Sequence, residues 1–278
     1  MIKMIKLILN KIPRGTLQRI AGWAMPVAGL WYTIGRVKNN GVECPLCGAR
    51  YRRFMPYGYV EVRRNALCPR CLALERHRML WLWLSRETDL LQATDPQKLG
   101  QQKPDLLQSG STKKMLHIAP EVCLSRKLEK ILPPENYITA DLESPLARVR
   151  LDVQSIPFAD GTFDVVMCNH VLEHVADDRL AMRELHRVTR AGGWGVLLSP
   201  VDETRAATFE DDTITSRRER TRLFGQYDHR RIYGRDYADR LRESGWQVSE
   251  IDYLAPLPPA ERKKFALRPE ILYVVRKI

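Results

Sequence analysis

The sequence of 278 residues contains no apolar run long enough to predict a membrane-spanning helix. Cysteine is also scarce. Six cysteines do not make a disulfide framework for a chain of this length, so we expect a reducing compartment, the cytoplasm. The hydrophobic fraction of 44% and the charged fraction of 28% are those of a globular protein. The length allows one large domain or two smaller ones.

Acidic residues are scarce in the N-terminal third of the chain. Residues 1–90 hold 16 Lys and Arg against 5 Asp and Glu, whereas the remaining residues hold 29 against 28. The positive field of this third predicts a polyanionic partner, with RNA, an acidic lipid surface and a charged carrier as the alternatives.

The first forty residues are taken as a basic amphipathic segment, residues 1–40. Residues 1–38 contain seven Lys and Arg and no acid, and Trp23, Trp31 and Tyr32 lie near their end. This composition is typical of an interfacial anchor, which would hold the protein peripherally on the inner face of a membrane. A helix that packs on the rest of the protein is the alternative, and both stay open.

Four of the six cysteines form two C-P-x-C pairs within residues 41–90. Twenty residues separate the pair Cys44 and Cys47 from the pair Cys68 and Cys71. Two such pairs can hold one tetrahedral Zn²⁺ and leave no open position, so we predict a structural zinc site. A helix over Leu72–Leu84 would complete a zinc-ribbon or treble-clef module. Iron is the alternative ion for the same four ligands.

The pattern of the chain changes after residue 112. Residues 91–112 are polar, Gln-rich and interrupted by Pro and Gly, which predicts a linker. Between residues 113 and 278 short apolar segments alternate with amphipathic ones, which predicts an α/β domain with a doubly wound, mostly parallel sheet. The expected strands are Met115–Ala119, Tyr137–Ala140, Phe163–Asn169, Gly195–Ser199, Gln247–Tyr253 and Ile271–Arg276, and the expected helices are Leu124–Ile131, Asp177–Val188 and Gly234–Ser244.

Glycine is absent where the first of these strands meets its helix. The junction reads Ala119-Pro120-Glu121, whereas nucleotide-binding enzymes normally have glycines there. In an open α/β sheet the ligand lies outside the carboxyl ends of the strands. Asp141 follows the second strand, twenty residues beyond Glu121, and an acid at that spacing accepts hydrogen bonds from ribose hydroxyls. Asp152 precedes the next strand, where it could meet an adenine amino group, and Asn169-His170 end that strand.

Three longer stretches combine these features: "LDVQSIPFADGTFDVVMCNHVLEHV", "AMRELHRVTRAGGWGVLLSP" and "GRDYADRLRESGWQV". They resemble the class I S-adenosylmethionine-dependent methyltransferases, particularly the methyltransferase type 11 group, and the resemblance covers about residues 113–277. It implies a seven-stranded Rossmann-like sheet with its last strand antiparallel. It also implies S-adenosylmethionine as methyl donor, lying across the carboxyl ends of the strands.

The resemblance implies roles for individual residues around this cofactor. Asp141 would bind the ribose, with Leu142 next to it in the chain. Asp152 and Val153 would hold the adenine. Asn169 and His170 would lie by the methionine portion.

The first loop departs from the family pattern. The family normally has an acid in the first strand and glycines after it, whereas this chain has His117 and then Ala119-Pro120-Glu121. S-adenosylmethionine carries no phosphate, and its sulfonium and ammonium groups are positive. A carboxylate such as Glu121 could therefore hold the ammonium, and Ala119 is still small. We predict a working variant loop, with a catalytically inactive scaffold as the alternative.

Residues 202–233 follow the strand Gly195–Ser199, where such enzymes often place a substrate cap. Within them His229, with Asp228 beside it, is the predicted general base, because a neutral imidazole suits removal of a proton from a hydroxyl or amine. Tyr233 could position the acceptor. A buried, hydrogen-bonded histidine is the structural alternative for His229.

Two further side-chain groups are candidates for contact with substrate. Arg230 and Arg231 could clamp a carboxylate or phosphate, or lie in solvent. A structural role is favoured for Glu173 and His174, which begin the segment after a core strand.

The expected reaction is methyl transfer to an O or N atom of a small-molecule, glycan or lipid-linked acceptor. An RNA methyltransferase is one alternative, because the cysteine module interleaves arginines with Tyr51, Phe54, Tyr57 and Tyr59. Against it, no N-P-P-Y-like tetrad follows the strand that ends at Asn169. A non-catalytic, zinc-containing binding module on the same scaffold is the other alternative. The sequence predicts neither the acceptor nor the oligomeric state.

Overall fold

The computed structural model describes residues 41–58, 62–91 and 113–278. The basic segment 1–40 and all but the first residue of the linker 91–112 lie outside the described residues, so the predictions made for them stay predictions. Among the described residues, no helix has both the length and the apolar character needed to cross a bilayer.

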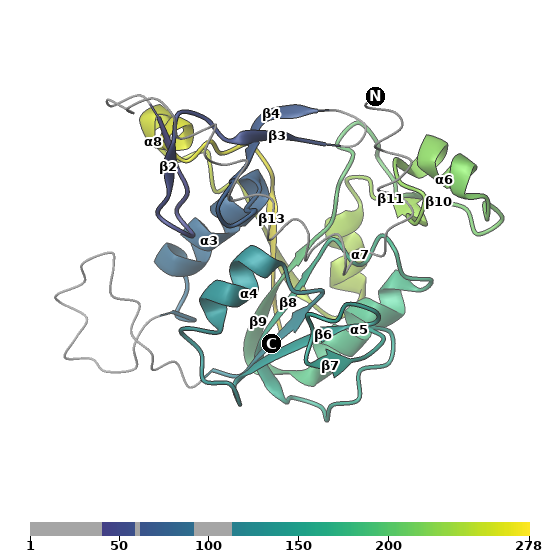
Figure 1. Ribbon diagram of the computed structural model, residues 1–278. Helices are drawn as coiled ribbons and strands as arrows, with labels where there is room; N and C mark the ends of the chain where they lie inside the picture. Colours follow the sequence, from purple (N-terminus) through teal and green to yellow (C-terminus); the bar gives the residue numbers. More distant parts are fainter. Residues whose placement is uncertain (1–40, 59–61, 92–112) are drawn as a thin grey trace.

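A seven-stranded sheet forms the centre of the molecule (Figure 1). Its strand order is β12-β13-β9-β8-β5-β6-β7, and every neighbouring pair is parallel except the two pairs that involve β13. The predicted mostly parallel sheet with its last strand antiparallel is therefore confirmed. The strands are β5 (Met115–Ile118), β6 (Tyr137–Asp141), β7 (Val149–Arg150), β8 (Phe163–Asn169), β9 (Thr189–Leu198), β12 (Gln247–Ile251) and β13 (Leu272–Arg276).

The two central strands are covered on both faces. All four residues of β5 and all seven of β8 are buried, as expected for strands that helices cover from either side. The helices are α3 (Glu75–Glu87), α4 (Val122–Leu128), α5 (Asp178–Val188) and α7 (Tyr237–Glu243). Helix α3 contacts α4, and α5 contacts α7; Figure 1 shows the two pairs on either side of the central strands.

Two predicted elements begin at other residues than expected. The strand expected to begin at Gly195 begins at Thr189, so the two glycines before it lie inside β9, at an irregularity in its pairing with β8. The helix expected to begin at Gly234 begins at Tyr237. A Cβ on Gly234 would lie 2.6 Å from the backbone of Ala207. This glycine therefore lies before the helix, where two backbone segments are too close for a side chain.

The cysteine module consists of two short hairpins and helix α3. The hairpins pair β1 (Val42–Glu43) with β2 (Arg50–Tyr51), and β3 (Met55–Tyr57) with β4 (Arg63–Leu67). Gly48 and Leu72 follow the two cysteine pairs at φ angles of 68° and 63°, and each donates its N–H to the first cysteine of its pair. The predicted helix over Leu72–Leu84 is wrong at its start, because Leu72 closes this turn in the left-handed region and the helix begins only at Glu75.

The module shares one hydrophobic core with the sheet. The rings of Trp83 in α3 and Trp194 in β9 meet edge to face with their centres 5.7 Å apart. Helix α8 (Pro259–Lys264) returns to β1, where Lys264 lies 3.6 Å from the Glu43 carboxylate. The cysteine module is therefore a structural part of the larger domain.

Arg78 ties the module to the C-terminal segment. Its side chain is fully buried, and its guanidinium donates to the carbonyls of Phe265 (2.7 Å), Ala266 (2.7 Å), Ala66 (2.8 Å) and Ala73 (2.9 Å). The ring of Phe54 lies under the guanidinium carbon at 4.3 Å, which adds a cation–π contact. One side chain thus satisfies carbonyls from three separate segments.

Replacing Arg78 by Met is expected to lower the free energy of unfolding by about 3 kcal/mol or more, because each lost charge-assisted bond contributes ~1.5–3 kcal/mol and leaves a buried carbonyl unpaired. Urea unfolding of the full chain measures this change. Arg50→Met is a matched control, since the Arg50 side chain is 73% exposed and its one ion pair lies on the surface. Equal stability of the two variants would contradict the role given to Arg78.

The segment after β9 forms a small unit at the carboxyl edge of the sheet. It pairs β10 (Phe209–Glu210) with β11 (Arg231–Ile232) and carries α6 (Arg217–Phe224) between them. Figure 1 shows this unit beside the upper end of the sheet. Its residues reach the loop that follows β8.

Candidate active site

The junction after β5 adopts a backbone conformation usually given to glycine. Ala119 has a φ of 49°, in the left-handed region, and its N–H donates to the Ala140 carbonyl at 2.8 Å. The missing glycine is thus replaced by the smallest residue with a Cβ, held in place by the neighbouring strand. The turn that the loop needs is present without its usual residue.

Glu121 is the centre of a polar cluster at this junction. The Nε2 of His117 donates to one oxygen of its carboxylate at 2.7 Å, and the amide nitrogen of Asn169 donates to the other at 3.1 Å. His117 is itself held by the hydroxyl of Tyr137, 2.7 Å from its Nδ1. Burial alone would raise the pKa of Glu121, but the hydrogen bond and charge of His117 outweigh it and lower that pKa to about 2. Glu121 is therefore an ionised carboxylate in a largely enclosed place.

A residue of the cysteine module completes this cluster. His77 of α3 has its Nε2 3.9 Å from the Glu121 carboxylate, and its Nδ1 accepts from the Leu74 backbone N–H. Burial lowers the pKa of His77 to about 3, so the ring is neutral and its Nε2 carries the hydrogen. The thiol of Cys123 also lies 3.3 Å from the Nδ1 of His77. The module thus contacts the loop directly.

An unpaired acceptor lies beside Glu121. The Oδ1 of Asn169 is buried and has no hydrogen-bond partner among the described residues. A buried amide oxygen without a donor is costly, so a donor supplied by a ligand would stabilise it. An ionised carboxylate and an unpaired oxygen at adjoining strand ends form a site for a cationic donor such as an ammonium.

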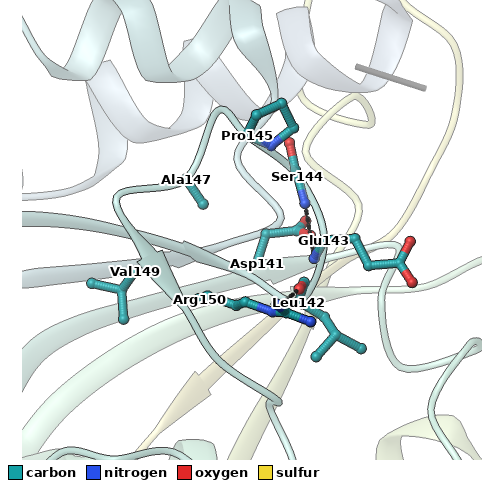
Figure 2. A pocket seen from close by; sticks show the side chains of 8 residues that line it. All are labelled: Asp141, Leu142, Glu143, Ser144, Pro145, Ala147, Val149 and Arg150. Carbon is teal, nitrogen blue, oxygen red and sulfur yellow. Dashed lines mark hydrogen bonds between the residues drawn. The ribbon is translucent and has the colours of Figure 1, made fainter. Parts of the chain in front are cut away.

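Asp141 lies at the end of β6, next to a pocket of about 390 Å³ lined by Asp141–Pro145, Ala147, Val149 and Arg150 (Figure 2). Its Oδ1 accepts from the backbone N–H groups of Glu143 (2.8 Å) and Ser144 (2.7 Å), which fixes the loop. Leu142 is 50% exposed, which is high for a large apolar side chain. An acid with an apolar neighbour at this position suits a nucleoside.

Asp152 and Val153 lie in the loop before β8. Asp152 accepts from the backbone N–H and side-chain amide of Gln154, and Val153 is buried. His170 follows β8 at a φ of 55°, with its Nδ1 3.5 Å from the Glu173 carboxylate. The structure thus places the predicted cofactor residues at the carboxyl ends of β5, β6 and β8 or in the loop that leads into β8.

His229 is brought next to two side chains for which a structural role was favoured. The carboxylate of Glu173, an imidazole nitrogen of His174 and one of His229 all lie within 4.8 Å of one another. His229 is buried, and its Nδ1 lies 3.0 Å from the Phe224 carbonyl. Burial lowers the pKa of its imidazole, which keeps the ring neutral. Asp228 contacts His174, with its carbonyl 3.3 Å from the Nδ1 of that ring.

Two of the residues predicted to contact substrate are used inside the protein. Tyr233 is fully buried and its hydroxyl donates to Asp178 at 2.8 Å, so it cannot position an acceptor. Arg231 is buried as well; its guanidinium donates to the carbonyls of Leu172, Val175 and Ala176. Arg231 therefore supports the loop that carries Glu173 and His174.

The four cysteines of the module converge. The sulfur of Cys44 lies 3.5 Å from that of Cys71, and the sulfur of Cys47 lies 3.7 Å from that of Cys68. A tetrahedral ion with metal–sulfur bonds of ~2.3 Å requires sulfur–sulfur distances of about 3.8 Å. Four thiolates this close together would repel one another, so a cation between them is needed to hold all four in the ionised form. The residues fit a four-thiolate metal site.

The aromatic side chains of the module are less available than the RNA alternative requires. Tyr51 and Phe54 are buried, and Phe54 is covered by Arg78. Tyr57 is partly buried, and Tyr59 lies outside the described residues. The exposed arginines Arg50, Arg52, Arg53, Arg64 and Arg70 keep the positive charge. Two of the four aromatic side chains expected to stack on RNA bases are therefore buried and cannot do so.

Residues 116–197 match the protein family described as a methyltransferase domain. This segment is similar to a methyltransferase domain. The family predicted from the motifs is therefore confirmed over this segment. An uncharacterised methyltransferase of Mycobacterium sp. (strain KMS) is 49% identical over 49 residues, which are 18% of this chain and 19% of that protein.

A second curated relative and a solved structure are also similar to this chain. The demethylmenaquinone methyltransferase of Mycobacterium marinum is 41% identical over 56 residues, 20% of this chain and 24% of that protein. A solved S-adenosylmethionine-dependent methyltransferase from Mesorhizobium loti is 14% identical, with a TM-score of 0.41, over 59% of this chain and 91% of that one. The chain thus spans about a fifth of the length of the first of these curated relatives.

Two contacts at the methyltransferase domain's strand ends were missed in the sequence. His77 belongs to the cysteine module, and nothing in its local sequence indicates that α3 packs beside Glu121. The spacing His170-x-x-Glu173-His174 was visible, but its partner His229 is 55 residues further along. Only the fold of residues 202–233 brings them together.

Proposed function

We propose that the protein is an S-adenosylmethionine-dependent methyltransferase. The observation that carries this proposal is the pair of acceptors at the ends of β5 and β8, the ionised Glu121 and the unpaired Oδ1 of Asn169. Both suit the positive ammonium of the cofactor, and neither suits a phosphate. The Ala119 turn opens the same edge of the sheet without glycine.

The remaining cofactor contacts follow from the order of the strands. Asp141 would accept hydrogen bonds from the ribose hydroxyls, and the exposed Leu142 would cover one face of the adenine. Asp152 and Val153 would hold the adenine edge, and Asn169 and His170 the methionine portion. When bound, S-adenosylmethionine would supply an electrophilic methyl group on its sulfonium.

The acceptor would lie on the side of β8 that faces residues 202–233. We propose an O or N atom of a small-molecule, glycan or lipid-linked acceptor, in the cytoplasm or at the inner face of a membrane. The burial of Tyr51 and Phe54 makes the exposed arginines of the module a weaker argument for RNA. His229 meets one requirement of a base, since its Nδ1 donates to Phe224 and leaves Nε2 unprotonated.

The four-cysteine cluster is proposed to hold a structural Zn²⁺. Cys44, Cys47, Cys68 and Cys71 would be its ligands and would leave no open position for chemistry. The ion would fix the two turns from which the β-hairpins and α3 start. It would thereby hold His77 beside Glu121.

Replacing Glu121 by Gln is expected to weaken S-adenosylmethionine binding about tenfold, because a charge-assisted hydrogen bond to the ammonium becomes a neutral one, a loss of ~1.4 kcal/mol. Calorimetric titration of the purified full chain measures the dissociation constant. Ala119→Gly is the matched control, since it keeps the carboxylate and the turn. An unchanged affinity in the Gln variant would refute the assignment of Glu121 to the ammonium.

A further inference from the structure

We propose that Glu173, His174 and His229 form a second metal site, which holds a first-row divalent cation at the acceptor side of the sheet. The three side chains come from two distant segments, the loop after β8 and the segment between α6 and β11. One ligand atom of each lies within 4.8 Å of the other two. Two histidines and one carboxylate are a common ligand set for such ions and leave open positions for other ligands.

The two imidazole rings lie close enough together to bind one ion. Their planes cross at 83° with the ring centres 4.7 Å apart. If one nitrogen of each ring bound the same cation with bonds of ~2.1 Å and a nitrogen–metal–nitrogen angle of about 90°, the ring centres would lie about 4.6 Å apart. The observed separation agrees with this geometry.

The hydrogen bonds of both rings leave the same nitrogen for the ion. The Nδ1 of His229 lies 3.0 Å from the carbonyl of Phe224, and the Nδ1 of His174 lies 3.3 Å from the carbonyl of Asp228. Carbonyl oxygens only accept, so each Nδ1 carries the hydrogen and each Nε2 has a free lone pair. A backbone carbonyl that fixes the ring in this way is the usual outer partner of a metal-binding histidine.

The Nε2 of His229 lacks a hydrogen-bond partner among the described residues. The ring is buried, with 6% exposed. A buried acceptor without a donor is costly unless something outside the chain satisfies it. The ring belongs to the cluster with Glu173 and His174, so a cation bound there would satisfy this nitrogen.

The carboxylate and its loop are held firmly in place. The hydroxyl of Ser199 donates to one oxygen of Glu173 at 3.0 Å, and the backbone carbonyl of Glu173 accepts from the N–H of Arg230. Arg231 holds the carbonyls on both sides of this loop. These contacts arrange Glu173 before any ligand binds, as a metal site requires.

The position of the site indicates the class of acceptor, and this step rests on the proposed methyltransferase function. His170, assigned to the methionine portion, lies 3.5 Å from Glu173 through its Nδ1. A cation here would lie beside the expected methyl group and bind an acceptor hydroxyl in an open position. With its Nε2 on the cation, His229 would serve as a ligand and not as the general base. The cation would lower the pKa of that hydroxyl, whose proton passes to solvent. The oxygen would then attack the methyl carbon while the carbon–sulfur bond breaks and its electron pair stays on sulfur. An oxygen acceptor is therefore favoured over nitrogen.

Titration of the zinc-loaded full chain with Co²⁺ tests the site. We expect one further equivalent to bind with the weak visible bands of a nitrogen and oxygen site, while the zinc content stays unchanged. Binding of Co²⁺ only by displacement of zinc, with strong thiolate charge-transfer absorption, would overturn the proposal. So would the absence of any binding. This measurement needs no variant and does not depend on folding of a mutant.

Variants show which residues bind the additional Co²⁺ ion. Glu173→Gln and His229→Ala are expected to weaken Co²⁺ binding by more than about 100-fold, because loss of even an outer-shell partner costs 10–100-fold. His186→Ala, which removes a histidine packed on Trp246 away from this site, should bind Co²⁺ unchanged. Equal affinity in folded Glu173→Gln would place the ion elsewhere and overturn the assignment. S-adenosylmethionine titrated into the same samples reports separately on the proposed function, because cobalt can bind without the cofactor and the cofactor without cobalt.

Discussion

Replacing Asp141 by Asn should weaken S-adenosylmethionine binding about a hundredfold. Two ribose hydroxyls would donate to this carboxylate, and hydrogen bonds to a charged partner contribute ~1.5–3 kcal/mol each, of which the neutral amide retains part. The amide would also point a donor at a hydroxyl that itself donates. A loss of about 2.7 kcal/mol corresponds to the expected hundredfold change.

Asn is a better replacement than Ala because the Asp141 side chain also holds the loop that follows β6. Its Oδ1 accepts from the backbone N–H groups of Glu143 and Ser144, and an amide oxygen can keep both bonds. Ala would free these N–H groups and disturb the loop, so a loss of binding would have two causes. Glu143→Gln is the matched control, because it removes a negative charge from the same loop without touching the ribose position. Equal effects of the two variants would mean that only loop charge matters.

Replacing Cys44 by Ser should release the metal of the cysteine module and destabilise the whole domain. Structural Zn²⁺ contributes ~10–16 kcal/mol of binding free energy in small zinc-finger peptides, so its loss can exceed the total stability of the module. The damage should spread, because α3 shares its core with the sheet through Trp83 and Trp194. We expect one thermal transition at a clearly lower temperature, together with loss of bound zinc measured by atomic emission.

The same variant should weaken cofactor binding at a distance. His77 lies 3.9 Å from Glu121 only while α3 is in place, and α3 begins just after the second cysteine pair. Cys123→Ser is the control, since Cys123 contacts His77 but is no ligand of the cluster. Retention of zinc, melting temperature and affinity in Cys44→Ser would contradict the structural role of the ion.

Much of the sheet could be predicted because its strands are short, apolar and separated by amphipathic helices. Apart from Asp164 and the terminal Asn169, β8 reads as an apolar strand, since both of its faces are covered. Helix α7 was correctly expected to end before Gly245, which has a φ of 98°. The two-residue strand β7 carries too little pattern to be seen, and Leu72 gives no hint of the left-handed turn that delays α3.

The sequence predicted which residues lie at the end of each strand. It did not predict the contacts between residues from different segments. Asp141 and Asn169 follow from the rule that ligands lie at carboxyl strand ends. Tyr233 and Arg231 were assigned to substrate because tyrosine and arginine often bind it, yet both lie in a buried polar network with Asp178. The contact of His77 with Glu121 depends on packing between two segments, which no local pattern encodes.

Calorimetric titration of the full chain with S-adenosylmethionine and with its demethylated product tests the central claim most directly. The account predicts binding of both with dissociation constants in the micromolar range, about −8 kcal/mol. It also predicts similar affinities, because both ligands carry the ribose and the ammonium that Asp141 and Glu121 would hold. Absence of binding to the folded, metal-loaded protein would contradict the account and leave the stretch from Met115 to Glu121 as a core strand and turn without a cofactor.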